Sequence, residues 1–304
     1  MCNCITPSYL KRGDYIGIIA TARKISPEEL QAAIEKFKEW GLNVILGDNV
    51  FSEYNQYAGS DEQRTKDLQN MLDNSTVRAV ICARGGYGTV RIIDHIDFSQ
   101  FVKSPKWIIG YSDATVLHSH INKNYNIETI HATMPLNFPA CGRDNNALNT
   151  LKTVLFGENL EYTIETNIFN RQGNATGKLA GGNLSLLYAL SGTVSDIDTS
   201  RKILFIEDLD EYLYHIDRMM MQLKRSGKLK NLAALIVGSM SDMKDNTITF
   251  GKTVYEIIAE AVAEYNYPVC FGFPAGHIDD NRALILGRKI LLNVSKNMVK
   301  IKFE

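Results

Sequence analysis

Segments with a strand pattern alternate with segments with a helix pattern along the first half of the chain. Four short apolar runs typical of buried strands stand at residues 15–20, 43–47, 78–83 and 107–109. Helix patterns lie between them, and the first is bounded by the start signals Ser26 and Pro27 and the stop signal Gly41. Because parallel strands need a long crossover, usually a helix, this alternation predicts an α/β fold with a parallel sheet covered by helices.

A second α/β region follows residue 173. Its expected strands are residues 202–206, 234–238 and 268–271, its expected helices are 216–226 and 253–265, and residues 289–294 and 298–303 form an expected β-hairpin. The stretch between the two regions is rich in Pro and polar residues, and one amphipathic segment interrupts it. We therefore expect an N-terminal domain over residues 1–137, a linker over 138–172 and a smaller C-terminal domain over 173–304.

Composition narrows the classes of function. The chain has 304 residues and a formal net charge of −1, which gives no electrostatic footprint for nucleic acid. No apolar run approaches the ~20 residues that cross a bilayer, and no signal core precedes Cys2 and Cys4. The five cysteines have no metal-ligand spacing. We expect a cytoplasmic protein with no membrane segment and no nucleic-acid partner.

Ser112 stands where the fourth apolar run gives way to a helix pattern. Gly110 ends the run, and a serine at such a turn projects its hydroxyl above the end of the sheet, beside the N–H groups of the next helix. That placement suits a nucleophile, although Ala114 replaces the second glycine of the G-x-S-x-G motif. Ser and Asp are also the preferred N-caps of helices, so a capping role for Ser112 stays open.

A glycine-rich segment, residues 84–88, follows the third apolar run directly and is called the glycine loop below. Its backbone N–H groups can approach a ligand closely. One interpretation is a phosphate loop, but the P-loop motif and the full G-x-G-x-x-G motif are absent. The other is an oxyanion donor beside Ser112, since both segments follow strands of one parallel sheet.

Glu207 and His277 follow strands of the second region. Glu207 begins an acidic run and directly follows an apolar strand, which would hold its side chain rigidly. Acidic runs at strand ends are commonly solvated turns, so that interpretation stays open. His277 stands between glycines and Asp279 and could act as a general base, although a lone histidine is more often structural. A serine nucleophile needs a base and the base an orienting carboxylate, so these residues could complete a triad. H-E-x-x-H is absent, so we expect no catalytic metal.

Taken together, six motifs in this order resemble the LD-carboxypeptidases, the serine peptidases of the murein tetrapeptide carboxypeptidase and microcin-immunity group. The motifs are Gly13-Asp14-Tyr15-Ile16-Gly17-Ile18, Arg84-Gly85-Gly86-Tyr87-Gly88, residues 109–118 around Ser112, Gly181-Gly182-Asn183-Leu184, Glu207-Asp208 with Asp217-Arg218, and Gly272-Phe273-Pro274-Ala275-Gly276-His277. The resemblance implies a Rossmann-like N-terminal domain, a C-terminal β/α domain and a site at their junction. It also implies a triad of Ser112, Glu207 and His277, with backbone oxyanion donors at Asp113 and Gly86.

The reaction that this resemblance implies is release of the terminal D-alanine from a murein tetrapeptide. It implies a cytoplasmic homodimer that serves peptidoglycan recycling and needs no cofactor. Arg84 and Tyr111 are the expected substrate contacts, with Arg84 holding the free carboxylate, although a structural ion pair would also explain Arg84.

Two departures from the family pattern bear on specificity. Thr21-Ala22-Arg23 replaces a common Pro-Ser-Ser, and His131-Ala132-Thr133-Met134 replaces a common His-Gly-Pro-Met. The alternatives are a related peptidase that cleaves a peptide–nucleotide antibiotic and a non-catalytic nucleotide-binding module.

Overall fold

The first sheet carries the alternation that the sequence predicts. The computed structural model describes residues 4–139 and 143–304, so Cys2 and Cys141 lie outside the described residues. This sheet has the strand order β11-β5-β4-β3-β1-β2, in which β1 to β5 are parallel. The strands are Tyr15–Ile19 (β1), Asn43–Leu46 (β2), Val77–Cys82 (β3), Trp107–Gly110 (β4), Thr129–His131 (β5) and Leu284–Leu286 (β11).

Helices cover both faces of this sheet because its strands are apolar on both faces. Ile18 and Ile81 pack into a core with α1 and α5, whereas Ile19 and Val80 pack into a second core with α2 and α4. The helices are Pro27–Glu39 (α1), Asp61–Asp73 (α2), Ser99–Lys103 (α3), Thr115–Tyr125 (α4) and Asn146–Leu155 (α5). Short 3₁₀ turns are Thr89–Arg91 (η1), Ile93–His95 (η2), Ser112–Ala114 (η3) and Pro135–Asn137 (η4).

The second sheet combines a parallel half with an antiparallel half. Its order is β10-β9-β8-β7-β12-β13-β6, with β7 to β10 parallel and β12, β13 and β6 antiparallel. The strands are Glu161–Glu165 (β6), Gly173–Asn183 (β7), Ile203–Leu209 (β8), Ala234–Ser241 (β9), Val269–Phe271 (β10), Lys289–Val294 (β12) and Met298–Phe303 (β13). The helices are Leu184–Ala189 (α6), Leu213–Arg225 (α7) and Val254–Ala261 (α8). The expected terminal hairpin is confirmed as β12 and β13.

The chain crosses between the two sheets more often than its sequence suggests. β6 arises from the expected linker, residues 138–172, and pairs with β13 at the edge of the second sheet. β11 arises from the expected C-terminal domain and pairs antiparallel with β5 in the first sheet. Domain boundaries at residues 137 and 173 therefore remain a prediction.

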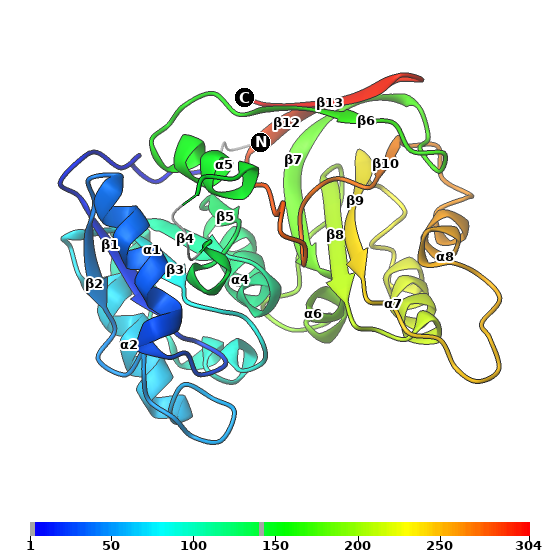
Figure 1. Ribbon diagram of the computed structural model, residues 1–304. Coiled ribbons are helices and arrows are strands. Elements are labelled where there is room, and N and C mark those ends of the chain that lie inside the picture. Colours follow the sequence, from blue (N-terminus) through cyan, green and yellow to red (C-terminus); the bar gives the residue numbers. More distant parts are fainter. Residues whose placement is uncertain (1–3, 140–142) are drawn as a thin grey trace.

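The two sheets lie side by side, with α4 and α6 between them (Figure 1). The α/β class predicted from the alternation is confirmed. Within the described residues, no helix is long and apolar enough to cross a membrane. Ser112 and His277 lie on loops that leave the carboxyl ends of β4 and β10, and Glu207 lies near the carboxyl end of β8 itself, where ligands bind in parallel sheets.

Candidate active site

Ser112 lies on a sharp turn between β4 and α4. Tyr111 is extended, and Ser112 adopts the left-handed region at φ +61°. That conformation costs a residue with a Cβ atom about 1–2 kcal/mol, and it persists where the surrounding structure imposes it. Neither η3 nor α4 has a side-chain cap hydrogen bond, so Ser112 does not cap the helix. The strained turn presents the hydroxyl for another role.

Two buried side chains secure this turn. His118 Nε2 lies 2.9 Å from the carbonyl oxygen of Gly110. Burial lowers the pKa of His118 to about 4, so the neutral ring donates to that carbonyl. On the other side, the Asp113 carboxylate accepts the backbone N–H of Thr89 at 2.8 Å, which ties the turn to the end of the glycine loop.

Glu207 and His277 form a hydrogen-bonded pair. His277 Nδ1 lies 2.7 Å from Glu207 Oε2, and the Glu207 side chain is completely buried. Because an ionised carboxylate only accepts, Nδ1 carries the proton and Nε2 is left as the acceptor. Burial alone would lower the pKa of His277, but the hydrogen bond and the charge of Glu207 outweigh it and raise the pKa. The pair has the arrangement of an oriented general base.

Ring packing places this pair against the nucleophile turn. The Tyr111 and His277 rings meet edge to face, with their centroids 4.8 Å apart, and Tyr111 directly precedes Ser112. A Cβ atom built on Gly85 would lie only 2.7 Å from Ser112 Oγ, so the glycine loop also touches the serine. The structure therefore brings together the serine turn, the histidine loop and the glycine loop, which belong to distant parts of the sequence.

A polar chain that the sequence reasoning missed links the two sheets at this point. The backbone N–H of Asn183 donates to Thr115 Oγ1 at 3.0 Å, and Asn183 Nδ2 donates to Asp208 Oδ1 at 3.0 Å. Burial and the neighbouring Glu207 raise the pKa of Asp208 to about 7. The Gly181-Gly182-Asn183-Leu184 motif was the available signal, since Gly182 is packed against Thr115 and a Cβ atom there would clash.

The expected substrate contacts lie around the same turn. Tyr111 donates its hydroxyl to Asn137 Oδ1 at 3.1 Å, which fixes the ring beside His277. Arg84 Nη1 donates to the carbonyl oxygen of Lys24 at 3.0 Å, and it lies 4.0 Å from the Glu29 carboxylate. The guanidinium of Arg84 is thus anchored to the chain before α1.

The two segments that carry the departures from the family pattern lie at this site. The exposed Arg23 side chain lies on Gly86, where a Cβ atom would meet its Cγ at 2.5 Å. His131 is buried, and its ring packs edge to face on Tyr111 at 5.9 Å. Burial lowers the pKa of His131 far below its ordinary value, so the ring is neutral. Among residues 4–139 and 143–304, no group of three His, Cys, Asp or Glu side chains is placed to hold a metal ion.

Comparison with known proteins assigns the family. The LD-carboxypeptidase N-terminal domain profile matches residues 16–132, and the LD-carboxypeptidase C-terminal domain profile matches residues 176–292. The chain belongs to the LD-carboxypeptidase family. It is therefore a peptidase by descent, and the predicted resemblance is confirmed.

Curated relatives in the family cover nearly the full chain. A probable murein peptide carboxypeptidase of Bacillus subtilis is 36% identical, over 97% of this chain and 94% of its own length. The murein tetrapeptide carboxypeptidase of Pseudomonas aeruginosa is 29% identical, over 91% of this chain and 92% of its own length.

Solved LD-carboxypeptidase-type structures share the fold. The muramoyltetrapeptide carboxypeptidase from Oxalobacter formigenes superposes with a TM-score of 0.87 at 29% identity, covering 95% of this chain and 98% of that one. The microcin C7 self-immunity protein MccF, in complex with aspartyl sulfamoyl adenosine, superposes with a TM-score of 0.86 at 20% identity, covering 99% and 98% of the two chains. At that identity, the second likeness speaks to the fold alone.

Proposed function

We propose that this peptidase releases the terminal D-alanine from murein tetrapeptides by attack of Ser112 on the amide between an L-centre and the D-residue. The observation that carries the proposal is that Tyr111, the residue before Ser112 on a turn held at φ +61°, packs against His277 of the hydrogen-bonded Glu207–His277 pair. The names of the B. subtilis and P. aeruginosa relatives support murein peptides as the substrate class.

The first half of the reaction forms an acyl-enzyme. His277 Nε2 takes the proton from Ser112 Oγ, and Oγ bonds to the carbonyl carbon of the scissile amide. Backbone N–H groups of Asp113 and Gly86 then stabilise the oxyanion, and each such donor contributes about 10²–10³ in rate in comparable sites. The protonated His277 gives its proton to the amide nitrogen as the C–N bond breaks, and D-alanine leaves.

The second half regenerates the enzyme. Water gives a proton to His277 Nε2 and attacks the acyl carbon, and the tripeptide leaves with a new carboxylate while Ser112 recovers its proton. Glu207 accepts the Nδ1 hydrogen bond throughout and stabilises the charged imidazole, in agreement with the raised pKa of His277.

Substrate selection requires a group that holds the free carboxylate of D-alanine. We assign this role to Arg84, whose Nη1 is anchored by the Lys24 carbonyl and whose planar guanidinium suits a carboxylate. Tyr111 forms the wall beside His277. The family resemblance supports action in the cytoplasm during wall recycling and assembly as a homodimer.

Mass spectrometry of defined tetrapeptides tests the proposal. We expect the wild-type protein to release D-alanine from a peptide with an L,D terminal bond and to leave the D,D isomer intact, and Ser112→Ala to release none. Equal release by Ser112→Ala would overturn the proposed nucleophile. Cleavage of an aminoacyl sulfamoyl nucleotide in place of the tetrapeptide would favour the microcin-immunity type of substrate, and tight nucleotide binding without cleavage would favour the binding module.

A further inference from the structure

A buried arginine stands behind the glycine loop. Arg64, on α2, has a completely buried side chain, although burying a guanidinium is costly unless its charge and its donors are matched. Its Nη1 donates to the carbonyl oxygens of Thr21 at 2.6 Å and Gly88 at 3.0 Å. Its Nη2 is paired with Asp61. The side chain therefore joins α2, the segment after β1 and the end of the glycine loop.

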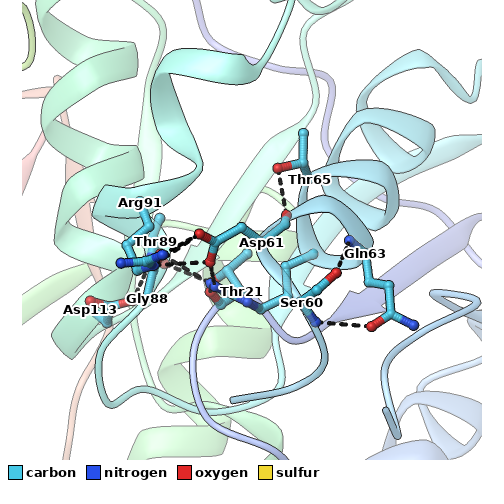
Figure 2. Close-up of polar contacts among 10 residues, drawn as sticks. Thr21, Ser60, Asp61, Gln63, Thr65, Gly88, Thr89, Arg91 and Asp113 are labelled. Carbon is cyan, nitrogen blue, oxygen red and sulfur yellow. Dashed lines mark hydrogen bonds and ion pairs between the residues drawn. The ribbon is translucent and has the colours of Figure 1, made fainter. Parts of the chain in front are cut away.

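The contacts at the end of the glycine loop converge on one peptide unit. The carbonyl of Gly88 and the N–H of Thr89 belong to the same peptide plane. Arg64 binds the carbonyl end. The Asp113 carboxylate binds the N–H end at 2.8 Å (Figure 2). Because the two ends of a planar unit are both held, its orientation is determined. Asp113 directly follows Ser112, so the same contact relates the glycine loop to the nucleophile.

The surrounding groups keep Arg64 in place. Asp61 also binds the exposed Arg91, whose Nε lies 3.0 Å from both carboxylate oxygens (Figure 2). Thr89 Oγ1 donates to Thr21 Oγ1 at 2.8 Å, which closes the ring of contacts. Gly88 leaves room for this approach, since a Cβ atom there would lie 2.6 Å from Arg64 Nη1 and its φ is +154°. Only glycine fits both the conformation and the close contact.

We infer that Arg64 is a positioning residue for the oxyanion hole, acting through the Gly88–Thr89 peptide together with Asp113. The inference rests on the proposed function, because it assigns the N–H groups of the glycine loop to oxyanion binding. Preorganised donors stabilise a transition state only while their orientation is held, and a displacement of about 1 Å can cost about 10²-fold in rate. Arg64 thus contributes to catalysis without touching the substrate.

The test uses Arg64→Met, Arg64→Lys and the matched control Arg288→Met in the full chain. Arg288 is a second arginine with little exposure, its side chain 12% exposed, and it is paired with Glu128 at the amino end of β5. The readouts are kcat and KM for D-alanine release, inhibition by a peptide aldehyde that forms a tetrahedral adduct, and inhibition by the product tripeptide. We expect Arg64→Met to lower kcat by about 10²-fold with little change in KM. Inhibition by the aldehyde should weaken in parallel with the fall in kcat/KM, whereas inhibition by the tripeptide should stay unchanged.

The conservative variant and the control make the result decisive. Arg64→Lys keeps one charged donor and should recover part of kcat, and it carries the test if Arg64→Met does not fold. Arg288→Met should lower the melting temperature and leave kcat unchanged. Three results would each overturn the inference. The first is a wild-type kcat in Arg64→Lys and in folded Arg64→Met. The second is an equal weakening of inhibition by the aldehyde and by the tripeptide, and the third is an equal loss of kcat in Arg288→Met. If wild type and Ser112→Ala release D-alanine equally, the proposed function fails instead.

Discussion

Backbone geometry holds the nucleophile side of the site, whereas side-chain pairing holds the acid–base side. Ser112 sits in a left-handed turn whose flanking carbonyl and carboxylate are bound by His118 and Thr89. Across the junction, the His277 ring is oriented by its hydrogen bond to Glu207, whose second oxygen, Oε1, has no hydrogen-bond partner among the described residues. The first region is preorganised by many contacts and the second is tuned by charge, so substitutions should affect them in different ways.

Removing the nucleophile should have the largest effect. We expect Ser112→Ala and Ser112→Gly to lower kcat by about 10⁶-fold, as in other serine peptidases. Since Ser112 pays for a left-handed φ that glycine adopts freely, Ser112→Gly should also be up to about 1 kcal/mol more stable than Ser112→Ala. Thermal denaturation measures the difference. Greater stability of Ser112→Ala would show that the turn is not strained.

Glu207→Gln tests the charge-tuned side and should rank next. We expect kcat to fall by about 10⁴-fold, because the amide holds His277 in the wrong tautomer. The base must be neutral to act, and Glu207 raises its pKa, so activity should rise with pH around a value above the ordinary 6.5. In Glu207→Gln, this rise in the pH profile of kcat/KM, its acidic limb, should move to lower pH. An unmoved limb in the pH profile of kcat/KM would contradict the assignment of His277.

The same pair predicts a pH dependence of stability. Because the folded pKa of His277 is raised, its contribution to stability is present below the unfolded pKa of about 6.5 and is lost as pH rises through the folded value. Urea denaturation across this range should show the decline in wild type. Glu207→Gln should lack it.

Gly85→Ala tests the preorganised side by steric means. The added Cβ atom would lie 2.7 Å from Ser112 Oγ, so we expect the hydroxyl to shift and kcat to fall by about 10²-fold. Gly17→Ala, on β1 and away from the site, is the control, since its Cβ atom would meet the flexible side chain of Met71 on α2. It should cost stability while leaving kcat unchanged. Equal kcat in Gly85→Ala and wild type would argue against close contact at Ser112.

Thr115→Val should give the smallest effect, because it weakens the link between the two regions and removes no group of the proposed triad or oxyanion hole. The change keeps the side-chain shape and leaves the Asn183 N–H without its acceptor, at a cost of about 1–3 kcal/mol in stability. We expect a smaller loss of kcat than in Gly85→Ala. Thr199→Val, which removes a hydroxyl bond to the Lys228 carbonyl, should cost stability alone. Enzyme kinetics and thermal denaturation of both variants separate the two effects.

Local patterns predicted much of the fold. The capping signals around Ser26 produce a capping box at the start of α1, and the alternating terminal strands form the hairpin of β12 and β13. The exchange of β6 and β11 between regions escaped prediction, because these short strands gain their stability from distant partners. For the same reason Arg64 gave no signal: a charged residue on a helix pattern ordinarily faces solvent.

By itself, the sequence determined the α/β class, the serine at a strand-to-helix turn and the family motifs around it. Those features depend on neighbours within a few residues, where propensity and periodicity act. Only the tertiary structure decided that the Glu207 carboxylate, and not another acid of its run, meets His277, and that Asp113 and Arg64 hold opposite ends of one peptide. Each partnership joins segments that are far apart in the chain but belong to one sheet, so these contacts form only when the strands of that sheet and its covering helices are assembled.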